Sequence, residues 1–221
     1  MSLSAMSPSA TPLCPLSSET LILPGLFGSA PEHWQRQWAR DRPASRVVEQ
    51  ADWDHPQRDA WLSRLEGAIA AAGEVWLVAH SLGCLLAAAL AERPLAAKVS
   101  GALLVAPCDL AVAEERHPGA IDFGAMPARA LPFPSLVVGS LDDPYMSADR
   151  LQETADGWGS GLVVLGKAGH INIDSGYGRW PGGYALLDRL RGAQTQNQAR
   201  RHLPPRANIA SWSAAAPLGR D

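Results

Sequence analysis

The most constraining feature of this 221-residue chain is the segment 74–92, in which an apolar run passes directly into an amphipathic helix. Residues 74–79 read Glu-Val-Trp-Leu-Val-Ala, which is typical of a strand buried on both faces. From Leu82, apolar residues recur at spacings of three and four, which predicts a helix over residues 82–92. A doubly buried strand needs cover on both faces, so the segment predicts an α/β fold with a parallel sheet.

Strand-like and helix-like segments alternate along most of the chain. The strands are expected at residues 20–23, 46–49, 74–79, 99–106, 135–139 and 161–165, and the helices at residues 31–41, 56–72, 82–92, 148–155 and 183–191. This order predicts a three-layer sandwich around a mostly parallel sheet of about six strands. Active sites of such sheets lie at the carboxyl ends of the strands, so the residues that follow each strand are the candidates for function.

The two ends of the chain lack this alternation. Residues 1–19 are rich in Ser, Pro and Ala and are expected to form a disordered leader. Residues 192–221 are rich in Ala, Arg and Pro and are expected to form a flexible tail. The α/β domain is therefore predicted to span residues 20–191.

Composition argues against several classes of protein. The net charge of −3 argues against a general nucleic-acid binder. No apolar stretch reaches the length of a membrane span, and the first residues lack the basic start and apolar run of a secretory signal, so we expect a cytoplasmic protein without a membrane partner. The three cysteines show neither a disulfide framework nor zinc-ligand spacing, so no metal is expected.

Ser81 stands where the buried strand meets the helix, and this placement predicts a nucleophile elbow. In such a turn, strained backbone exposes the serine Oγ, and the residues two before and two after it must be small. Here they are Ala79 and Gly83, a departure by one methyl group from the usual pair of glycines. The alternative interpretation is a serine that merely caps the helix.

A serine nucleophile needs a base and an acid, which follow it in this order of strands. His170 comes directly after the last strand and is the candidate base. Asp142 and Asp143 follow the strand at 135–139, and spacing alone does not choose between them. Pro144 fixes the backbone after Asp143 and favours that residue as the acid, while Asp142 is suited to capping a turn.

Two backbone N–H groups would form an oxyanion hole. One is that of Leu82, directly after the nucleophile, at a helix N-terminus where the dipole favours negative charge. The second is expected from the loop after the first strand, where Leu26 is the candidate, and Gly25 and Gly28 allow that loop to turn toward the site.

Four side chains are candidates for the substrate pocket. His33 and Trp34 follow the oxyanion loop, with packing at the start of a helix as the alternative interpretation. Phe123 and Met126 lie in the longest connection, residues 107–134, and are expected to roof an acyl pocket. That connection is too short for a separate cap domain, which favours small substrates.

Five segments resemble a known family in sequence and order. They are LPGLFGSAPEHW, the DW-x-x-P of residues 52–56, VAHSLGC, GSLDDPY and GHINIDSGYGRWPGG, within residues 20–191. The chain thereby resembles the small α/β-hydrolase-fold serine hydrolases of the retinoblastoma-binding protein 9 type, especially their bacterial members. The resemblance implies Ser81 as nucleophile, Asp143 as acid, His170 as base, and hydrolysis of small esters.

The resulting hypothesis is a serine hydrolase of the carboxylesterase kind, which cleaves small ester or amide substrates through an acyl-enzyme and needs no metal or organic cofactor. The alternative is a protein-interaction module on a hydrolase scaffold, with little or no turnover. Haloperoxidase or lyase chemistry on the same residues stays open. The oligomeric state and natural substrate are not predicted.

Overall fold

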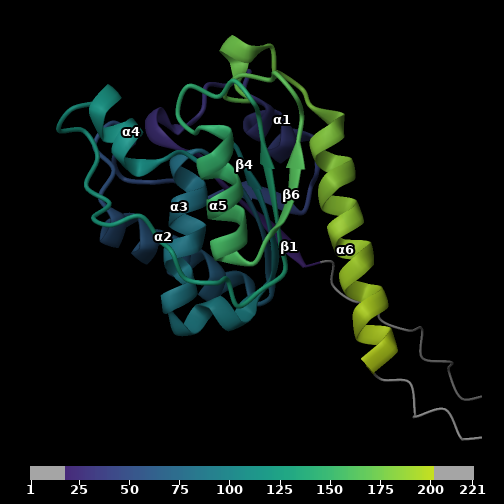
Figure 1. Ribbon diagram of the computed structural model, residues 1–221. Coiled ribbons are helices and arrows are strands. Elements are labelled where there is room, and N and C mark those ends of the chain that lie inside the picture. Colours follow the sequence, from purple (N-terminus) through teal and green to yellow (C-terminus); the bar gives the residue numbers. More distant parts are fainter. Residues whose placement is uncertain (1–17, 202–221) are drawn as a thin grey trace, which may run out of the picture.

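A six-stranded, all-parallel sheet forms the middle layer of the protein (Figure 1). The computed structural model describes residues 18–201. The strand order is β2-β1-β3-β4-β5-β6. The strands are β1 (Glu19–Leu23), β2 (Ser45–Val47), β3 (Val75–His80), β4 (Val99–Val105), β5 (Ser135–Gly139) and β6 (Gly161–Val164).

Helices cover both faces of the sheet, which makes residues 18–201 a three-layer sandwich of the α/β-hydrolase fold, and this described part of the chain contains no separate cap (Figure 1). One face carries α1 (Trp34–Asp41) and α6 (Pro181–Arg201), and the other carries α2 (Arg58–Ala72), α3 (Leu82–Ala89) and α5 (Ala148–Trp158). A short helix, α4 (Leu110–Arg116), follows β4. Single 3₁₀ turns occur at Leu26–Gly28, Leu90–Glu92, Pro94–Lys98 and Ile173–Ser175.

Alternate residues of each central strand enter different cores. Leu77 of β3 packs in the core beneath α2, α3 and α5, whereas its neighbour Val78 packs in the core beneath α1 and α6. Leu21 and Ile22 of β1 divide in the same way. Because side chains of a strand point alternately to its two faces, burial of both faces requires the continuous apolar runs seen in the sequence.

Tryptophans on α1 join that helix to two distant parts of the chain. Trp34 is fully buried, and its indole N–H donates a hydrogen bond to the backbone oxygen of Ile171 at 2.8 Å. Its ring also meets the edge of Trp180 at 5.5 Å, and Trp38 meets Tyr184 of α6 at 4.6 Å. Trp180 and Tyr184 are partly buried, and aromatic pairs of this kind contribute strongly to packing. They join α1 to α6 and to the loop between β6 and α6.

Some predicted boundaries were wrong. The helix expected at 31–41 begins only at Trp34, because His33 is its N-cap and accepts a hydrogen bond from Gln35 N. The helix expected at 82–92 is α-helical only to Ala89. The connection at 107–134 contains α4, which was not predicted; Asp109 caps it by accepting from Ala111 N.

The predicted domain limits also need correction. Glu19 belongs to β1 rather than to a leader, and α6 continues past residue 191 to Arg201. Apolar residues become rare in α6 after residue 191. No proline occurs before Pro204, however, so the backbone hydrogen bonding of the helix continues to Arg201 (Figure 1). The rest of the expected leader and tail, residues 1–17 and 202–221, lies outside the described residues. Within residues 18–201, no helix combines the length and apolar character needed to cross a membrane.

The start of α3 lies unusually close to the end of β1. A Cβ atom at Gly83 would overlap the carbonyl oxygen of Leu23 and lie 2.7 Å from that of Pro24. Both obstacles are backbone atoms of a central strand and its loop, which cannot move aside cheaply. Glycine at this position is therefore a requirement of the packing between strand and helix.

We expect Gly83→Ala to lower the free energy of unfolding by about 3 kcal/mol, because overpacking forces the backbone apart. Gly67→Ala is the matched control. Gly67 is an exposed residue inside α2 with nothing within 4 Å of the added methyl group, so this change should stabilise the protein by about 0.5–1 kcal/mol. Urea denaturation measures both, and equal effects of the two substitutions would contradict the close approach.

Candidate active site

Ser81 occupies the sharp turn between β3 and α3. Its backbone has φ 54° and ψ −124°, a conformation that non-glycine residues rarely adopt. The turn is held by hydrogen bonds from Ser81 N to the oxygen of Val105 at 3.1 Å and from Cys84 N to the oxygen of Ser81 at 2.9 Å. The side chain lines a cavity at the carboxyl edge of the sheet.

His170 connects Ser81 to Asp143. Its Nε2 lies 2.9 Å from Ser81 Oγ, and its Nδ1 lies 2.9 Å from each carboxylate oxygen of Asp143. A carboxylate only accepts hydrogen bonds, so Nδ1 carries the proton and Nε2 is free to accept the proton of Ser81 Oγ. The side chains of His170 and Asp143 are only 7% and 2% exposed, which strengthens the electrostatic interaction between them.

The two neighbouring aspartates have different partners. Asp143 faces His170, whereas Oδ1 of Asp142 accepts hydrogen bonds from Ser140 Oγ at 2.7 Å and from Gly169 N at 2.8 Å. These two bonds, of which the one from Ser140 has the larger effect, lower the pKa of Asp142. Asp142 thus links the loop after β5 to the loop that carries His170, and the geometry favours Asp143 as the partner of the imidazole.

The backbone of His170 is held from both sides. The imidazole Nε2–H of His80 donates to the carbonyl oxygen of His170 at 2.9 Å, and His170 N donates to Ser175 Oγ at 3.1 Å. Ser175 Oγ in turn donates to Asn172 Oδ1 at 2.9 Å. The role of His80 was missed from the sequence, although a histidine at the end of an apolar strand is a signal for a buried hydrogen bond.

The two candidate oxyanion donors belong to segments that lie against each other. Leu26 and Leu82 both line the cavity beside Ser81. A Cβ atom at Gly25 would lie 2.9 Å from Ser81 Cβ and 3.1 Å from Leu82 N, so the loop after β1 runs along the elbow. The cavity therefore has backbone of both segments next to the Ser81 hydroxyl.

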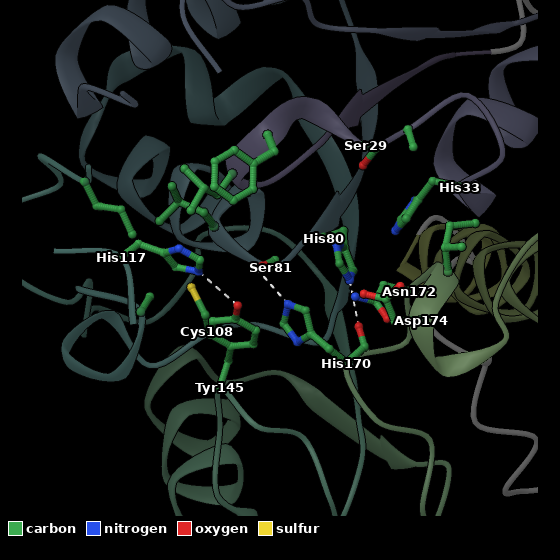
Figure 2. A pocket seen from close by; sticks show the side chains of 17 residues that line it. Ser29, His33, His80, Ser81, Cys108, His117, Tyr145, His170, Asn172 and Asp174 are labelled. Atoms are coloured by element: carbon green, nitrogen blue, oxygen red, sulfur yellow. Dashed lines mark hydrogen bonds between the residues drawn. The ribbon is translucent and has the colours of Figure 1, made fainter. Parts of the chain in front are cut away.

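The cavity has a volume of about 530 Å³ and is open to solvent. Figure 2 shows the side chains that line it. Its apolar lining comes mainly from the loop after β1 and from the region of α4: Leu26, Phe27, Ala30, Leu82, Ala113, Ile121 and Ile173. Four of the six histidines of the chain belong to its polar lining. The full polar lining is Ser29, His33, His80, Ser81, Cys108, His117, Tyr145, His170, Asn172 and Asp174.

The structure brings one of the four predicted pocket residues, His33, into this lining and places the other three elsewhere. Trp34 turns into the core beneath α1 and α6. Phe123 is 1% exposed and packs against the edge of Trp61 at 5.6 Å. Met126 packs against the same core and lines a separate small hollow beside α5. Residues 107–134 do reach the cavity, but not through Phe123 and Met126. The side chains that they contribute to the lining are Cys108, Ala113, His117 and Ile121.

Backbone strain is concentrated around this cavity. Within residues 18–201, five non-glycine residues have positive φ, and all lie in the segments that follow strands at the carboxyl edge of the sheet: Phe27, Ser29, Ser81, Ala106 and Ile171. Such conformations cost of order 1–3 kcal/mol each and persist where the surrounding structure enforces them. Their clustering at one edge supports the assignment of this edge as the functional site.

Burial keeps several groups around Ser81 uncharged at neutral pH. Desolvation, with smaller effects of His170 and Arg36, lowers the pKa of His33 from 6.5 to about 4. Burial also places the pKa of His80 well below its usual value and raises the pKa of the Cys108 thiol to about 12. No group of three or more His, Cys, Asp or Glu side chains in the described part of the chain could hold a metal ion.

Comparison with known proteins agrees with this architecture. A family model described as "Serine hydrolase" matches residues 20–189. A YdeN-like hydrolase from Pectobacterium atrosepticum is 31% identical, with 80% of this chain and 91% of that chain covered and a TM-score of 0.69. The ydeN product of Bacillus subtilis is 19% identical, with coverage of 80% and 100% and a TM-score of 0.66. An esterase from Thermogutta terrifontis, 16% identical with coverage of 82% and 89%, has a TM-score of 0.52. A search of curated proteins gave no match.

The lowered pKa of His33 predicts a loss of stability in mild acid. Between pH 6.5 and about 4 the unfolded chain binds a proton at His33 that the folded chain does not, so the free energy of unfolding falls as the pH falls through this window. The slope contributed by this group approaches about 1.4 kcal/mol per pH unit.

His33→Asn removes this titration and keeps a side chain suited to the N-cap of α1. We expect the variant to lose less stability than the wild type between pH 6.5 and 4, as measured by urea denaturation at a series of pH values. Parallel curves for the two proteins would show that His33 titrates normally in the folded state.

Proposed function

The chain belongs to the serine hydrolase family, and we propose that it cleaves small carboxylic esters through Ser81, His170 and Asp143. One observation carries the proposal: the hydrogen bonds from Ser81 Oγ to His170 Nε2 and from His170 Nδ1 to Asp143 form one continuous chain. The motifs around these residues further support a place among relatives of the retinoblastoma-binding protein 9 type.

The proposed reaction follows from the protonation state of His170. Ser81 Oγ attacks the ester carbonyl carbon while its proton passes to His170 Nε2, and Asp143 stabilises the imidazolium that forms. The tetrahedral oxyanion is stabilised by the N–H groups of Leu26 and Leu82. His170 then protonates the leaving alcohol, and the acyl-enzyme is hydrolysed by a water molecule that His170 activates in the same way.

The size and lining of the cavity support small substrates. Its volume of about 530 Å³ lies at the lower part of the usual range for ligand pockets. The apolar side chains of Leu26, Ala113 and Ile121 suit a short acyl or alkyl group. Neutral His33 and His80 add hydrogen-bonding groups to the wall without adding charge.

Removal of the nucleophile tests the proposal directly. We expect purified protein to hydrolyse p-nitrophenyl acetate and Ser81→Ala to reduce kcat by about 10⁴-fold or more. Ser63→Ala, at an exposed position on α2, is the matched control and should leave the rate unchanged. A fluorophosphonate probe should label the wild type and the control but not Ser81→Ala. Equal turnover in all three proteins would refute the assignment.

The two aspartates provide a second test. Asp143→Asn should lower kcat by about 10⁴-fold, because an amide in place of the carboxylate no longer holds the required tautomer of His170. Asp142→Asn keeps the acceptor oxygen for the hydrogen bonds from Ser140 and Gly169 and loses only the charge that strengthens them, so we expect a loss on the order of tenfold or less. Steady-state kinetics on p-nitrophenyl acetate distinguish the two, and the reverse ranking would assign the acid to Asp142.

A further inference from the structure

His117 and Tyr145 form a hydrogen-bonded pair in the wall of the cavity that the proposed reaction does not use. His117 Nε2 lies 3.0 Å from the hydroxyl oxygen of Tyr145, and the two rings are stacked at 6.0 Å with an angle of 10° (Figure 2). The two residues come from different segments, since His117 directly follows α4 and Tyr145 follows β5. Both side chains line the cavity.

Tyr145 is fixed beside the proposed triad. Its ring lies 4.6 Å from the ring of His170, and its backbone N–H donates to Asp143 Oδ1 at 2.8 Å. Its carbonyl oxygen accepts a hydrogen bond from Asp109 N at 2.9 Å. Figure 2 shows Tyr145 and His170 pointing side by side toward Ser81. The hydroxyl group therefore has a defined position on the side of His170 that faces the cavity.

The pair can either donate a hydrogen bond to a ligand or accept one from it. A neutral imidazole has one N–H donor and one acceptor nitrogen, and a hydroxyl group both donates and accepts. If His117 Nε2 donates to Tyr145, the hydroxyl proton is free for a ligand; if the hydroxyl donates to His117, a lone pair on its oxygen is free instead. Burial raises the pKa of Tyr145, so the hydroxyl keeps its proton at neutral pH.

The leaving-group atom of the substrate would lie close to this hydroxyl. His170 Nε2 is the atom that protonates the leaving group in the proposed reaction, and the ring of Tyr145 packs beside that imidazole. We infer that the Tyr145 hydroxyl, supported by His117, binds the leaving-group atom, donating to an ester oxygen or accepting from an amide N–H. The inference rests on the proposed function and widens its substrate class to small aryl and alkyl esters together with the matching amides.

The binding experiment uses Ser81→Ala as background, so that the ester is not consumed. Calorimetric titration with phenyl acetate and with acetanilide, which share the acetyl and phenyl groups, gives the two dissociation constants. We expect Tyr145→Phe to weaken binding of both ligands by about fivefold to tenfold, the effect of one hydrogen bond. Tyr177→Phe is the matched control and should change neither, because Tyr177 lies in the loop between β6 and α6, packs on Trp180 and does not line the cavity.

A double substitution tests the pair itself. His117→Phe keeps an aromatic ring between Phe27 and Tyr145 but removes the hydrogen bond. We expect it to weaken binding less than Tyr145→Phe, and the double variant to match Tyr145→Phe, because His117 acts through the tyrosine hydroxyl. Additive losses would overturn the supporting role of His117. If Tyr145→Phe weakens binding of phenyl acetate but not of acetanilide, or if acetanilide does not bind, the Tyr145 hydroxyl does not accept a hydrogen bond from an amide N–H, and that part of the inference is overturned.

A purely structural role is tested with Ser81 present. Inactivation by phenylmethanesulfonyl fluoride requires Ser81 and His170 but offers no ester oxygen or amide nitrogen as the leaving atom. We expect Tyr145→Phe to be inactivated within about twofold of the wild-type rate while kcat/KM for phenyl acetate falls about tenfold. A parallel fall of both rates would mean that Tyr145 only positions His170. Absence of Ser81-dependent turnover in the wild type would refute the proposed function, whereas Tyr145-dependent binding in the Ser81→Ala background would still support the tyrosine hydroxyl as the group that binds an ester oxygen or an amide N–H.

Discussion

The close crossing of β1 and α3 determines the geometry of the site. Because no side-chain atom fits between Gly83 and the carbonyl oxygens of Leu23 and Pro24, the first turn of α3 lies directly on the end of β1. The chain can leave β3 and enter α3 at this distance only through a sharp turn, and Ser81 takes the positive φ that the turn requires. The same contact brings the loop after β1 against Leu82, so one packing constraint exposes the serine hydroxyl and places two segments of backbone beside it.

Around this turn, buried but uncharged groups surround a single acid–base pair. His33, His80 and Cys108 are neutral at physiological pH because burial penalises their charged forms. These groups act through hydrogen bonds rather than through charge. His80, for example, donates a hydrogen bond to the backbone oxygen of His170. Because the side chains of His170 and Asp143 are only 7% and 2% exposed, water screens their interaction little, which is the condition under which fixed dipoles and hydrogen bonds stabilise a transition state most effectively.

The sequence predicted the layers, the parallel sheet and the residues at the strand ends, because these depend on local periodicity and on a fixed topological rule. It did not predict side-chain direction in irregular segments. Phe123 and Met126 were expected over the pocket, but their connection folds inward and presents Ala113 and His117 instead. Trp34, the first residue of α1, packs its indole into the core beneath α1 and α6, where the indole N–H donates to the oxygen of Ile171. In each case the outcome depends on tertiary packing that a single sequence does not encode in a readable pattern.

The three proposed reacting residues and the walls of the cavity come from different parts of the fold. Ser81, Asp143 and His170 stand directly after strands or on the loop that follows one, so the sheet fixes their mutual geometry. The walls come from the loop after β1 and from α4, which pack on the sheet from outside. Tyr145 and His117 connect the wall to the three residues at the strand ends. The backbone N–H of Tyr145 donates a hydrogen bond to Asp143, and its hydroxyl is hydrogen-bonded to His117, which directly follows α4. A change in α4 would thus alter which leaving group is bound while the hydrogen-bonded chain from Ser81 to Asp143 keeps its geometry.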